Sequence, residues 1–488
     1  MKTLVLQLAR LGDIYQTWPV LAALKRLHPD SELHLLTRAK FAAATEGLGI
    51  VDKHWLLDTR EVLSPLIDEP SGIDEAMRKL DELRERLVSE RFERVINLSF
   101  SPFSSFLTYE ISRQALVVRG YTRFDDGYLN IPDDASAYFY AQVGIDRPNR
   151  LHITDLFAHV AGVELEESDW TILEQHEEST GEESGTILLH VGASVELKTL
   201  SVPKWQMVAK GLLSRWPGPV VLIGSEGERA KAEQIAAISG ERKPENLVGR
   251  TSLQELISLI RDARLLIGGD SGPVQIASLV NTPVLNISLR SVSFWETGPR
   301  SKGSRILRVD DESQIAAEEI VDEAMALMRG EPSKLGAIMV PVRNGPYTET
   351  SGKKDCFDWD LLRALYMGAD FPPPPSELFL LGLRRLNEVS DLALEQIETI
   401  EKNPGNTIAV SILEQSDILM DQIMSLVPDV APIVRWFQTE KIRIGPRPVG
   451  ELIQVTRDVY RKLQDITKLY LPENSGVDLR VEAAAEGD

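Results

Sequence analysis

One segment, GGDSGPVQIA at positions 268–277, constrains the fold of this chain more than any other stretch. It follows the apolar run 263–267 and precedes the strand-like TPVLNIS. A strand, a Gly-Asp-Ser-Gly turn and a proline at the expected first helical position predict a helix N-terminus, whose free backbone N–H groups attract anions. The segment therefore predicts a phosphate-binding turn. Its residues are Asp270, Ser271, Gly272 and Pro273.

Short β-rich runs alternate with helical stretches from residue 2 to about residue 330. The alternation restarts at position 186, after the polar and acidic segment 174–185, which has the composition of a linker. Strands that alternate with helices predict parallel sheets covered on both faces, with ligands at the carboxyl ends of the strands. We therefore predict two Rossmann-like α/β domains, residues 1–175 and 186–330, with a cleft between them.

The alternation stops after residue 330, where apolar residues instead recur three and four apart in long stretches. This spacing predicts helices at 378–402, 406–426 and 449–471, within an all-α module of unknown role at 335–488. We predict that an apolar stripe in this module is bundle core, and an oligomer or acceptor-protein interface is the alternative. The stripe consists of Leu413, Ile418, Met420, Ile423 and Met424. The basic segment 435–447 is predicted to be a solvated face.

The formal net charge of −21 over 488 residues argues against nucleic acid and anionic membrane surfaces as partners, because recognition of either needs a basic face. The single cysteine, Cys356, excludes a disulfide framework and fits a reducing compartment. Charge returns at Arg10 and Asp13 before a signal-peptide core is complete. We expect a cytoplasmic protein with at most peripheral contact to the inner membrane.

Three loops that follow strands carry polar residues suited to a ligand site. The first strand ends in ARLGD, which places Arg10, Gly12 and Asp13 at the sheet edge, although Asp13 has a simpler reading as a helix-capping residue. After the strand at 186, the GASVELK loop offers Ser194 and Lys198; such a lysine can bind a diphosphate or be a solvated surface residue. Glu228 follows a third strand, where carboxylates often bind ribose hydroxyls.

The order of these pieces along the chain resembles glycosyltransferase family 9, the ADP-heptose heptosyltransferases. The matching pieces run from about residue 2 to about residue 330. They are RLGD followed by PVLAALK, VINLSFS, HVGAS with Lys198 and PKW, LIGSEGE, NLVGRTSLQELISLIRDARLLIGGDSGP, and WETGP. The resemblance implies a GT-B architecture and an inverting sugar transfer without a metal or other cofactor, from ADP-heptose or a related nucleotide sugar.

The resemblance also implies roles for individual residues. Asp13 matches the family's proposed general base, and Lys198 its diphosphate-contacting lysine. Ser194 matches a hydroxyl near the phosphates, and Glu228 the ribose contact. The turn at Asp270, Ser271 and Gly272 matches the seat of the diphosphate.

This chain departs from the family pattern at two places. Gln275 stands where the family usually has a histidine, so a neutral amide replaces one donor near the diphosphate or sugar. The usual FGPT-like loop is absent, and its place is taken by ISLRSVSFWETGP, where Arg290 is a candidate replacement for a phosphate contact and Thr297 is a further candidate site residue.

Other chemistries lack their motifs in this sequence. The seven histidines show no metal-ligand spacing, and neither a GxGxxG after the first strand nor a Walker A lysine motif occurs. His190 could face the cleft, but we favour a structural role for it, and a packing or capping role for His152 and His159.

The leading hypothesis is a heptosyltransferase whose acceptor is the inner core of lipopolysaccharide. The runner-up is a glycosyltransferase that modifies a surface or flagellar protein in the cytoplasm, because the acidic chain and the extra module fit a phosphorylated lipid poorly. A catalytically degenerate scaffold or binding protein is the third reading; Gln275 favours it, whereas Asp13, Lys198 and Asp270 in order oppose it.

Overall fold

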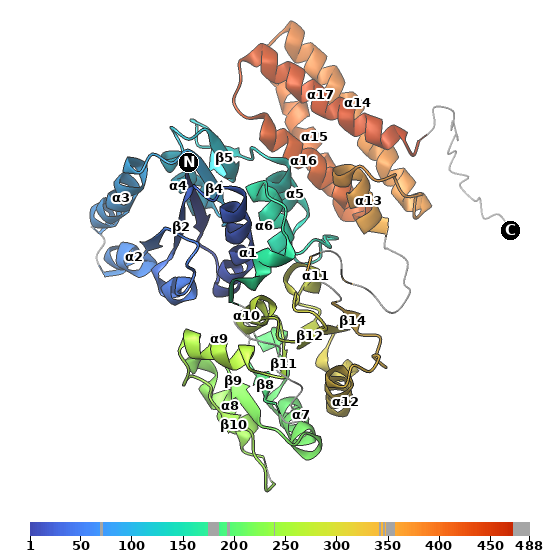
Figure 1. Cartoon of the computed structure of the whole chain (residues 1–488). Helices are drawn as coiled ribbons and strands as arrows, with labels where there is room; N and C mark the ends of the chain where they lie inside the picture. Colours follow the sequence, from blue (N-terminus) through green and yellow to red (C-terminus); the bar gives the residue numbers. More distant parts are fainter. Residues whose placement is uncertain are drawn as a thin grey trace, which may run out of the picture. The chain divides into compact units, whose positions relative to one another are not determined.

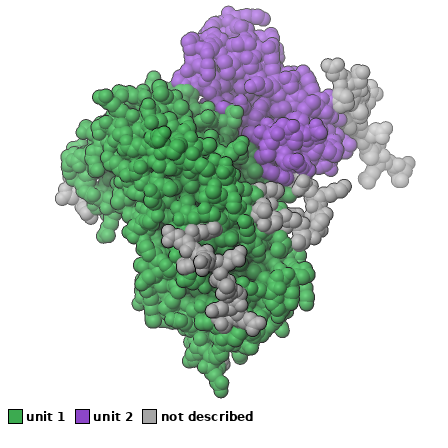
Figure 2. All heavy atoms as spheres, in the orientation of Figure 1, with its two compact units in different colours: residues 1–139, 143–354 green, residues 140–142, 355–488 purple. Residues whose placement is uncertain are grey.

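The fold is described from a computed structural model of the whole chain (Figure 1). The described residues are 1–68, 72–173, 185–192, 196–238, 240–340, 343–344, 347 and 357–471. The chain divides into two compact units, one of residues 1–139 and 143–354 and one of residues 140–142 and 355–488 (Figure 2). The first unit holds two large separate sheets and a small two-stranded one, and the second unit is helical; the two large sheets and the helical unit match the sequence prediction.

The first sheet is parallel throughout, with strand order β3-β2-β1-β4-β5. Its strands are β1 (Lys2–Gln7), β2 (Glu32–Arg38), β3 (Lys53–Leu57), β4 (Arg94–Asn97) and β5 (Val117–Gly120). Leu4, Val5 and Leu6 of the central strand β1 are fully buried, because helices cover both faces of such a sheet. The order reverses beside β1, so the loop after β1 opens at the position where this fold type binds ligands.

The helices of this half begin at the carboxyl edge or in the loops that follow it. They are α1 (Leu11–Leu27), α2 (Thr59–Asp68), α3 (Ile73–Ser89), α4 (Pro102–Ile111), α5 (Asp134–Gln142) and α6 (Ile153–Ala161), with 3-10 helices η1 (Ala39–Thr45) and η2 (Glu167–Leu173) and a small hairpin of β6 (Thr122–Arg123) and β7 (Leu129–Asn130). Leu87 of α3 and Leu107 of α4 join Leu4, Leu6 and Val95 of the sheet in one core cluster.

The second sheet has the order β10-β9-β8-β11-β12-β13-β14, in which only β14 is antiparallel. Its strands are β8 (Ile187–His190), β9 (Val220–Ile223), β10 (Glu245–Asn246), β11 (Leu265–Gly268), β12 (Val284–Leu289), β13 (Arg305–Val309) and β14 (Ile338–Met339). Strand β14 pairs with β13, so part of the range assigned to the helical module completes this sheet. The domain limits proposed at residues 175, 186, 330 and 335 otherwise stay predictions.

The helices of this half are α7 (Val202–Arg215), α8 (Arg229–Ala236), α9 (Leu253–Arg261), α10 (Gly272–Val280), α11 (Phe294–Thr297) and α12 (Ala317–Met328), with 3-10 helices η3 (Glu196–Lys198), η4 (Glu226–Glu228) and η5 (Glu312–Gln314). One core cluster joins Ile187 and Leu189 of β8 with Trp205 and Leu212 of α7 and Ile320 of α12. Helices α7 and α12 therefore share one face of the sheet.

The helical unit contains α13 (Phe357–Met367), α14 (Glu377–Lys402), α15 (Thr407–Leu426), η6 (Pro428–Val430), α16 (Ala431–Ile444) and α17 (Val449–Lys468). The three long predicted helices are confirmed, each within three residues at either end. Phe379, Met420, Phe437 and Tyr460 are fully buried in its core. No helix among the described residues is both long and apolar enough to span a membrane.

The apolar stripe predicted for this unit divides between core and surface. Met420 is fully buried, and Leu413, Ile423 and Met424 pack against the same cluster. The prediction is wrong for Ile418, which is 58% exposed on α15. The side chains of the basic segment lie along α16 and just beyond its end, and acidic groups bind at least three of them: Lys441 contacts Asp417 at 2.5 Å, Arg443 contacts Glu440 at 2.8 Å, and Arg447 contacts Glu451.

A buried ion pair joins α12 to β13 in the second half. Arg305 donates to Glu323 at 2.7 Å, and the two side chains are 4% and 2% exposed. Removing one partner of such a pair leaves an uncompensated buried charge, which is expensive.

We expect Glu323→Ala to lower the free energy of unfolding by about 3–5 kcal/mol, because it leaves the buried Arg305 guanidinium without its carboxylate partner. The matched control is Asp322→Ala, which removes the neighbouring exposed ion pair with Arg215 and is expected to cost less than about 1 kcal/mol. Urea denaturation of both variants, followed by tryptophan fluorescence, compares them. Equal stability of the two variants would contradict the expected energetic role of the buried pair.

Candidate functional site

A cavity of about 690 Å³ lies at the carboxyl edges of the two sheets and is lined from both halves of the first unit. We call it the site cleft. It brings together eleven of the thirteen predicted site residues. These are Arg10, Gly12, Asp13, Lys198, Glu228, Asp270, Ser271, Gly272, Pro273, Gln275 and Thr297. Ser194 lies outside the described residues, and Arg290 lines a different cavity.

Helices α1 and α10 meet at their N-termini, where each carries a glycine. A Cβ atom at Gly12 would lie 3.7 Å from Cγ of Gln275, and one at Gly272 would lie 3.4 Å from Cδ2 of Leu11. Both distances are ordinary van der Waals contacts, so the two helix ends lie close together with room for a methyl group. Because α1 belongs to the first half and α10 to the second, this contact sets Asp13 opposite the Asp270 turn across the site cleft.

The residues that cap four helical segments line the site cleft. Arg10 precedes α1, Ser252 precedes α9, Ser271 precedes α10, and Ser225 precedes η4, which leads into α8. Each helix N-terminus carries partial positive charge and unsatisfied backbone N–H groups. Their convergence makes the site cleft suited to a ligand that carries several negative charges, such as a diphosphate.

Asp13 is partly buried in the first turn of α1. Its Oδ2 accepts a hydrogen bond of 2.8 Å from the backbone N–H of Arg10, so the capping role considered from the sequence is present. No residue in the described part of the chain donates a hydrogen bond to Oδ1, which leaves that oxygen available to a ligand. Burial raises the pKa of Asp13, and the negative charge of Asp270 raises it further, against the opposing effect of Arg10.

Lys198 and Asp270 form an ion pair in the site cleft, with Nζ 3.3 Å from Oδ2. The two side chains are 16% and 18% exposed. Gly269 makes this arrangement possible, because a Cβ atom there would lie 2.5 Å from the carbonyl oxygen of Lys198. The ammonium group therefore lies beside the turn that opens α10, where a bound anion would meet both.

Glu228 caps the turn that precedes α8. Its Oε2 accepts hydrogen bonds from the backbone N–H of Ser225 at 2.6 Å and from Oγ of Ser225 at 3.0 Å. The carboxylate packs on two glycines, because a Cβ atom at Gly192 would overlap it and one at Gly224 would lie 2.7 Å from Oε2. Glycines at both positions thus let a carboxylate sit at the ends of β8 and β9.

Gln275 does not present a free amide to the site cleft. Its side chain is 4% exposed and donates a hydrogen bond of 2.6 Å to the carbonyl oxygen of Thr297.

Glu296, which was not among the predicted residues, connects the two halves of the first unit. Its Oε1 accepts hydrogen bonds from the backbone N–H of Gly144 at 2.9 Å and from Nδ2 of Asn149 at 3.1 Å. The segment after β12 is thereby tied to the first half, and burial raises the pKa of Glu296.

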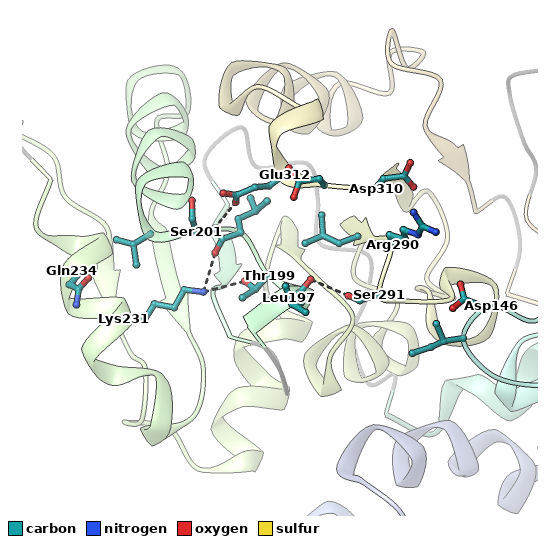
Figure 3. A pocket seen from close by; sticks show the side chains of 15 residues that line it. Asp146, Leu197, Thr199, Ser201, Lys231, Gln234, Arg290, Ser291, Asp310 and Glu312 are labelled. Carbon is teal, nitrogen blue, oxygen red and sulfur yellow. Dashed lines mark hydrogen bonds between the residues drawn. The ribbon is translucent and has the colours of Figure 1, made fainter.

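Arg290 lines a second cavity of about 840 Å³ instead of the site cleft. Figure 3 shows Arg290 and Asp310 on one side of this cavity and Lys231 on the other. The chain turns here because β12 ends at Leu289 and Oγ of Ser291 donates to the carbonyl oxygen of Leu197 at 3.1 Å. We therefore leave Arg290 out of the site as a phosphate contact.

Two further buried polar residues line the site cleft: Gln16, which the sequence analysis did not single out, and His190, which it considered as a residue that could face the cleft. Gln16 is 3% exposed, and its Nε2 has no hydrogen-bond partner in the described part of the chain. Its position three residues after Asp13, on the same helix face, was the available signal. His190, for which we favoured a structural role, lines the cleft with an unpartnered Nδ1, and burial lowers its pKa to about 4.

A packing or capping role was predicted for two other histidines, of which His159 is exposed on α6. His152 is buried and caps α6, where its Nδ1 accepts a hydrogen bond of 3.2 Å from the backbone N–H of Thr154.

One cluster among the described residues has ligand atoms close enough together to share a metal ion: Glu32, His34 and Glu90. It lies at the amino ends of β1 and β2, and Lys2 already binds Glu90 at 2.7 Å.

Comparison with known proteins was made by sequence and by structure. The family model for glycosyltransferase family 9 (heptosyltransferase) matches residues 80–324, about half of the chain. Lipopolysaccharide heptosyltransferase 1 of Campylobacter coli is 26% identical over 307 residues, which cover 59% of this chain and 83% of that protein. Lipopolysaccharide heptosyltransferase 3 of Escherichia coli is 22% identical over 281 residues, or 57% and 79% of the two chains.

Solved structures of low sequence identity share the fold. A family 9 glycosyl transferase from Veillonella parvula covers 68% of this chain and 97% of its own, with a TM-score of 0.50 and 19% identity. An Escherichia coli heptosyltransferase solved with ADP covers 67% of this chain and all of its own, with a TM-score of 0.51 and 15% identity. The predicted GT-B architecture of the two α/β halves is thereby confirmed.

We expect Gly192→Ala to destabilise the protein because the added methyl group displaces the Glu228 carboxylate from its bonds to Ser225. The expected loss is about 0.5–1.5 kcal/mol, the net contribution of an ordinary hydrogen bond, because the bonds to Ser225 are exposed and the carboxylate can move aside. Gly227→Ala is the matched control, because the nearest atom to its added Cβ is Ser225 Oγ at 3.9 Å. Thermal unfolding compares the two variants, and identical midpoints would contradict the close packing at Gly192.

Proposed function

Because this chain belongs to glycosyltransferase family 9 and is therefore a glycosyltransferase, we propose that it transfers heptose or a related sugar from an ADP-sugar to an acceptor hydroxyl. The reaction inverts the anomeric centre and uses no metal ion. The observation that carries the proposal is the site cleft, where a carboxylate with one unbonded oxygen lies across from a lysine and a helix N-terminus.

Asp13 is the proposed general base. The acceptor hydroxyl oxygen attacks the anomeric carbon while the bond from that carbon to the diphosphate oxygen breaks, and Asp13 takes the hydroxyl proton. A base of raised pKa accepts a proton more readily, and the burial of Asp13 supplies that shift. The hydrogen bond from Arg10 to Oδ2 fixes the carboxylate, so that Oδ1 can receive the proton.

Lys198 and the N-terminus of α10 are the proposed stabilisers of the departing diphosphate. Negative charge grows on the bridging oxygen as the bond to the sugar breaks, and fixed positive groups stabilise that charge without rearranging. The N–H groups at Ser271 and Gly272 and the Lys198 ammonium group can act together at this point. These protein groups supply the positive charge that a metal ion would otherwise provide.

Glu228 is the proposed ligand of the ribose hydroxyls. Its carboxylate lines the site cleft beyond the end of β9, where nucleotide-binding folds place an acidic residue. Thr251 and Leu253 line the same side of the cleft and give that region polar and apolar surface for the base.

The proposed acceptor is the inner core of lipopolysaccharide, and we place the reaction in the cytoplasm with at most peripheral contact to the inner membrane. The names of the Campylobacter and Escherichia relatives support this choice of acceptor. The test incubates the protein with ADP-heptose and a heptose-deficient lipopolysaccharide and follows the acceptor by mass spectrometry. A gain of one heptose supports the proposal; transfer only to protein supports the runner-up, and nucleotide binding without any transfer supports a scaffold.

We expect Lys198→Ala to weaken ADP binding about tenfold to a hundredfold, because a charge-assisted contact to the diphosphate is lost. Lys210→Ala, which removes the same charge from an exposed position on α7, should leave affinity unchanged. Calorimetric titration with ADP, UDP and GDP measures both variants and the parent protein. Tighter binding of UDP or GDP would keep the fold assignment and overturn the choice of donor.

We expect Asp13→Asn to lower kcat by about 10²–10⁴-fold while ADP affinity is retained, because the amide cannot accept the proton. The base must be ionised, and its pKa is raised above the ordinary value of 3.8. Activity of the parent protein should therefore fall on acidification at a higher pH than an ordinary aspartate would give. The pH profile of kcat/KM checks this, and a parent-like rate in the variant would remove Asp13 as the base.

A further inference from the structure

Helix α15 of the helical unit has one long face without a charged residue. Its opposite side carries Ala409, Ser416 and Met420, which are buried. Three apolar side chains on the outer face are largely exposed: Leu426 at 76%, Ile408 at 72% and Ile418 at 58%. The uncharged face consists of Ile408, Ser411, Ile412, Gln415, Ile418, Leu419, Gln422, Ser425 and Leu426.

Six of these residues follow the spacing of a coiled-coil seam. Positions 408, 412, 415, 419, 422 and 426 alternate steps of four and three residues along the helix. This spacing keeps side chains in a single line toward a partner helix. Four of the six are isoleucine or leucine and two are glutamine, so the seam is apolar with polar interruptions.

The absence of charge on this face stands out against the rest of the molecule. The chain carries a net charge of −21 and about a quarter of its residues are charged. The acidic residues of α15 lie on its other sides, where Lys441 binds Asp417 at 2.5 Å and Gln438 binds Asp421 at 2.7 Å. Two copies of the chain can therefore meet along this face without opposing carboxylates.

We propose that this face is the contact between two copies of the chain, which pack α15 against α15 about a twofold axis. A twofold contact uses the same patch on both copies, so each residue must be compatible with the identical surface. Gln415 and Gln422 meet this condition because an amide both donates and accepts hydrogen bonds. A basic partner protein would be better matched by acidic residues on the face, and a membrane-binding helix by flanking basic residues.

The size of the face sets the expected strength of the dimer. A helix of 20 residues is about 30 Å long and about 10 Å wide, so each face covers about 300 Å² and two such faces bury roughly 600 Å². This area is smaller than that of a standard stable interface. We therefore expect a reversible dimer whose population depends on protein concentration.

Sedimentation equilibrium of the full-length protein over a range of concentrations tests the proposal. Leu419→Glu places two carboxylates at the seam and should raise the dimer dissociation constant at least about tenfold. Leu452→Glu on α17 is the matched control, because Leu419 and Leu452 are both 39% exposed. Gln415→Glu changes an exposed residue without altering side-chain size, so it tests the face even if Leu419→Glu impairs folding.

Salt provides an independent test. Raising NaCl from about 0.05 M to about 0.5 M screens the repulsion between two acidic chains, so an uncharged contact should become tighter. An interface held by ion pairs would weaken instead. A protein that stays monomeric at all concentrations, or a dimer that is insensitive to both α15 variants or weakened by salt, would overturn the proposal.

Discussion

The shared direction of the parallel strands is the constraint on which the site depends. When neighbouring strands run the same way, the helices that follow them start at the same sheet edge, and their positive ends point to the same region. In this protein Arg10, Ser225, Ser252 and Ser271 cap four such starts around one cavity. The acidic chain thus gathers helix N-termini, Arg10 and Lys198 around one cavity, which supports the proposed binding of an anion there.

Close backbone contacts bring this region together. Helix α1 meets α10 at Gly12 and Gly272, while Gly192 and Gly269 admit the Glu228 carboxylate and the carbonyl of Lys198 at distances that a Cβ atom would prevent. The positions of these polar groups therefore depend on neighbouring glycines, which have no Cβ atom in the way. This explains why the loops after β1, β8 and β11 combine glycines with the charged residues of the site.

The parts of the site encoded by local sequence could be predicted. Asp13 and the Asp270 turn each lie directly between a strand and its helix, so the sequence pattern alone fixes their edge of the sheet. The position of Arg290 depends instead on how the chain leaves β12 and contacts Leu197, which no local pattern reveals. Gln16 was missed because its importance arises from burial in the cleft, and Ile418 was misassigned because helical spacing does not tell which side of a helix faces solvent.

The same reasoning explains the limits of predicting the fold. The apolar spacing of the long helices in the C-terminal unit predicted their ends to within three residues. Strand β14 has only two residues, too few to show a sequence pattern, and it is recognised as a strand because it pairs with β13. Similarly, the role of Glu296 depends on Gly144 and Asn149, which are distant in the sequence. Contacts of this kind become visible only when both halves are folded.

Because Lys198 is paired with Asp270, any anion that binds Lys198 in the cleft must compete with that aspartate. An incoming anion does not meet an isolated ammonium group. It must compete for the Lys198 ammonium group with the Asp270 carboxylate, which already lies 3.3 Å from it. The net gain on binding is the difference between the two interactions, so a ligand with a single negative charge gains little over the resident aspartate. A ligand with two phosphoryl groups brings more negative charge to the ammonium group, so it should compete with the resident aspartate better than a monovalent anion does.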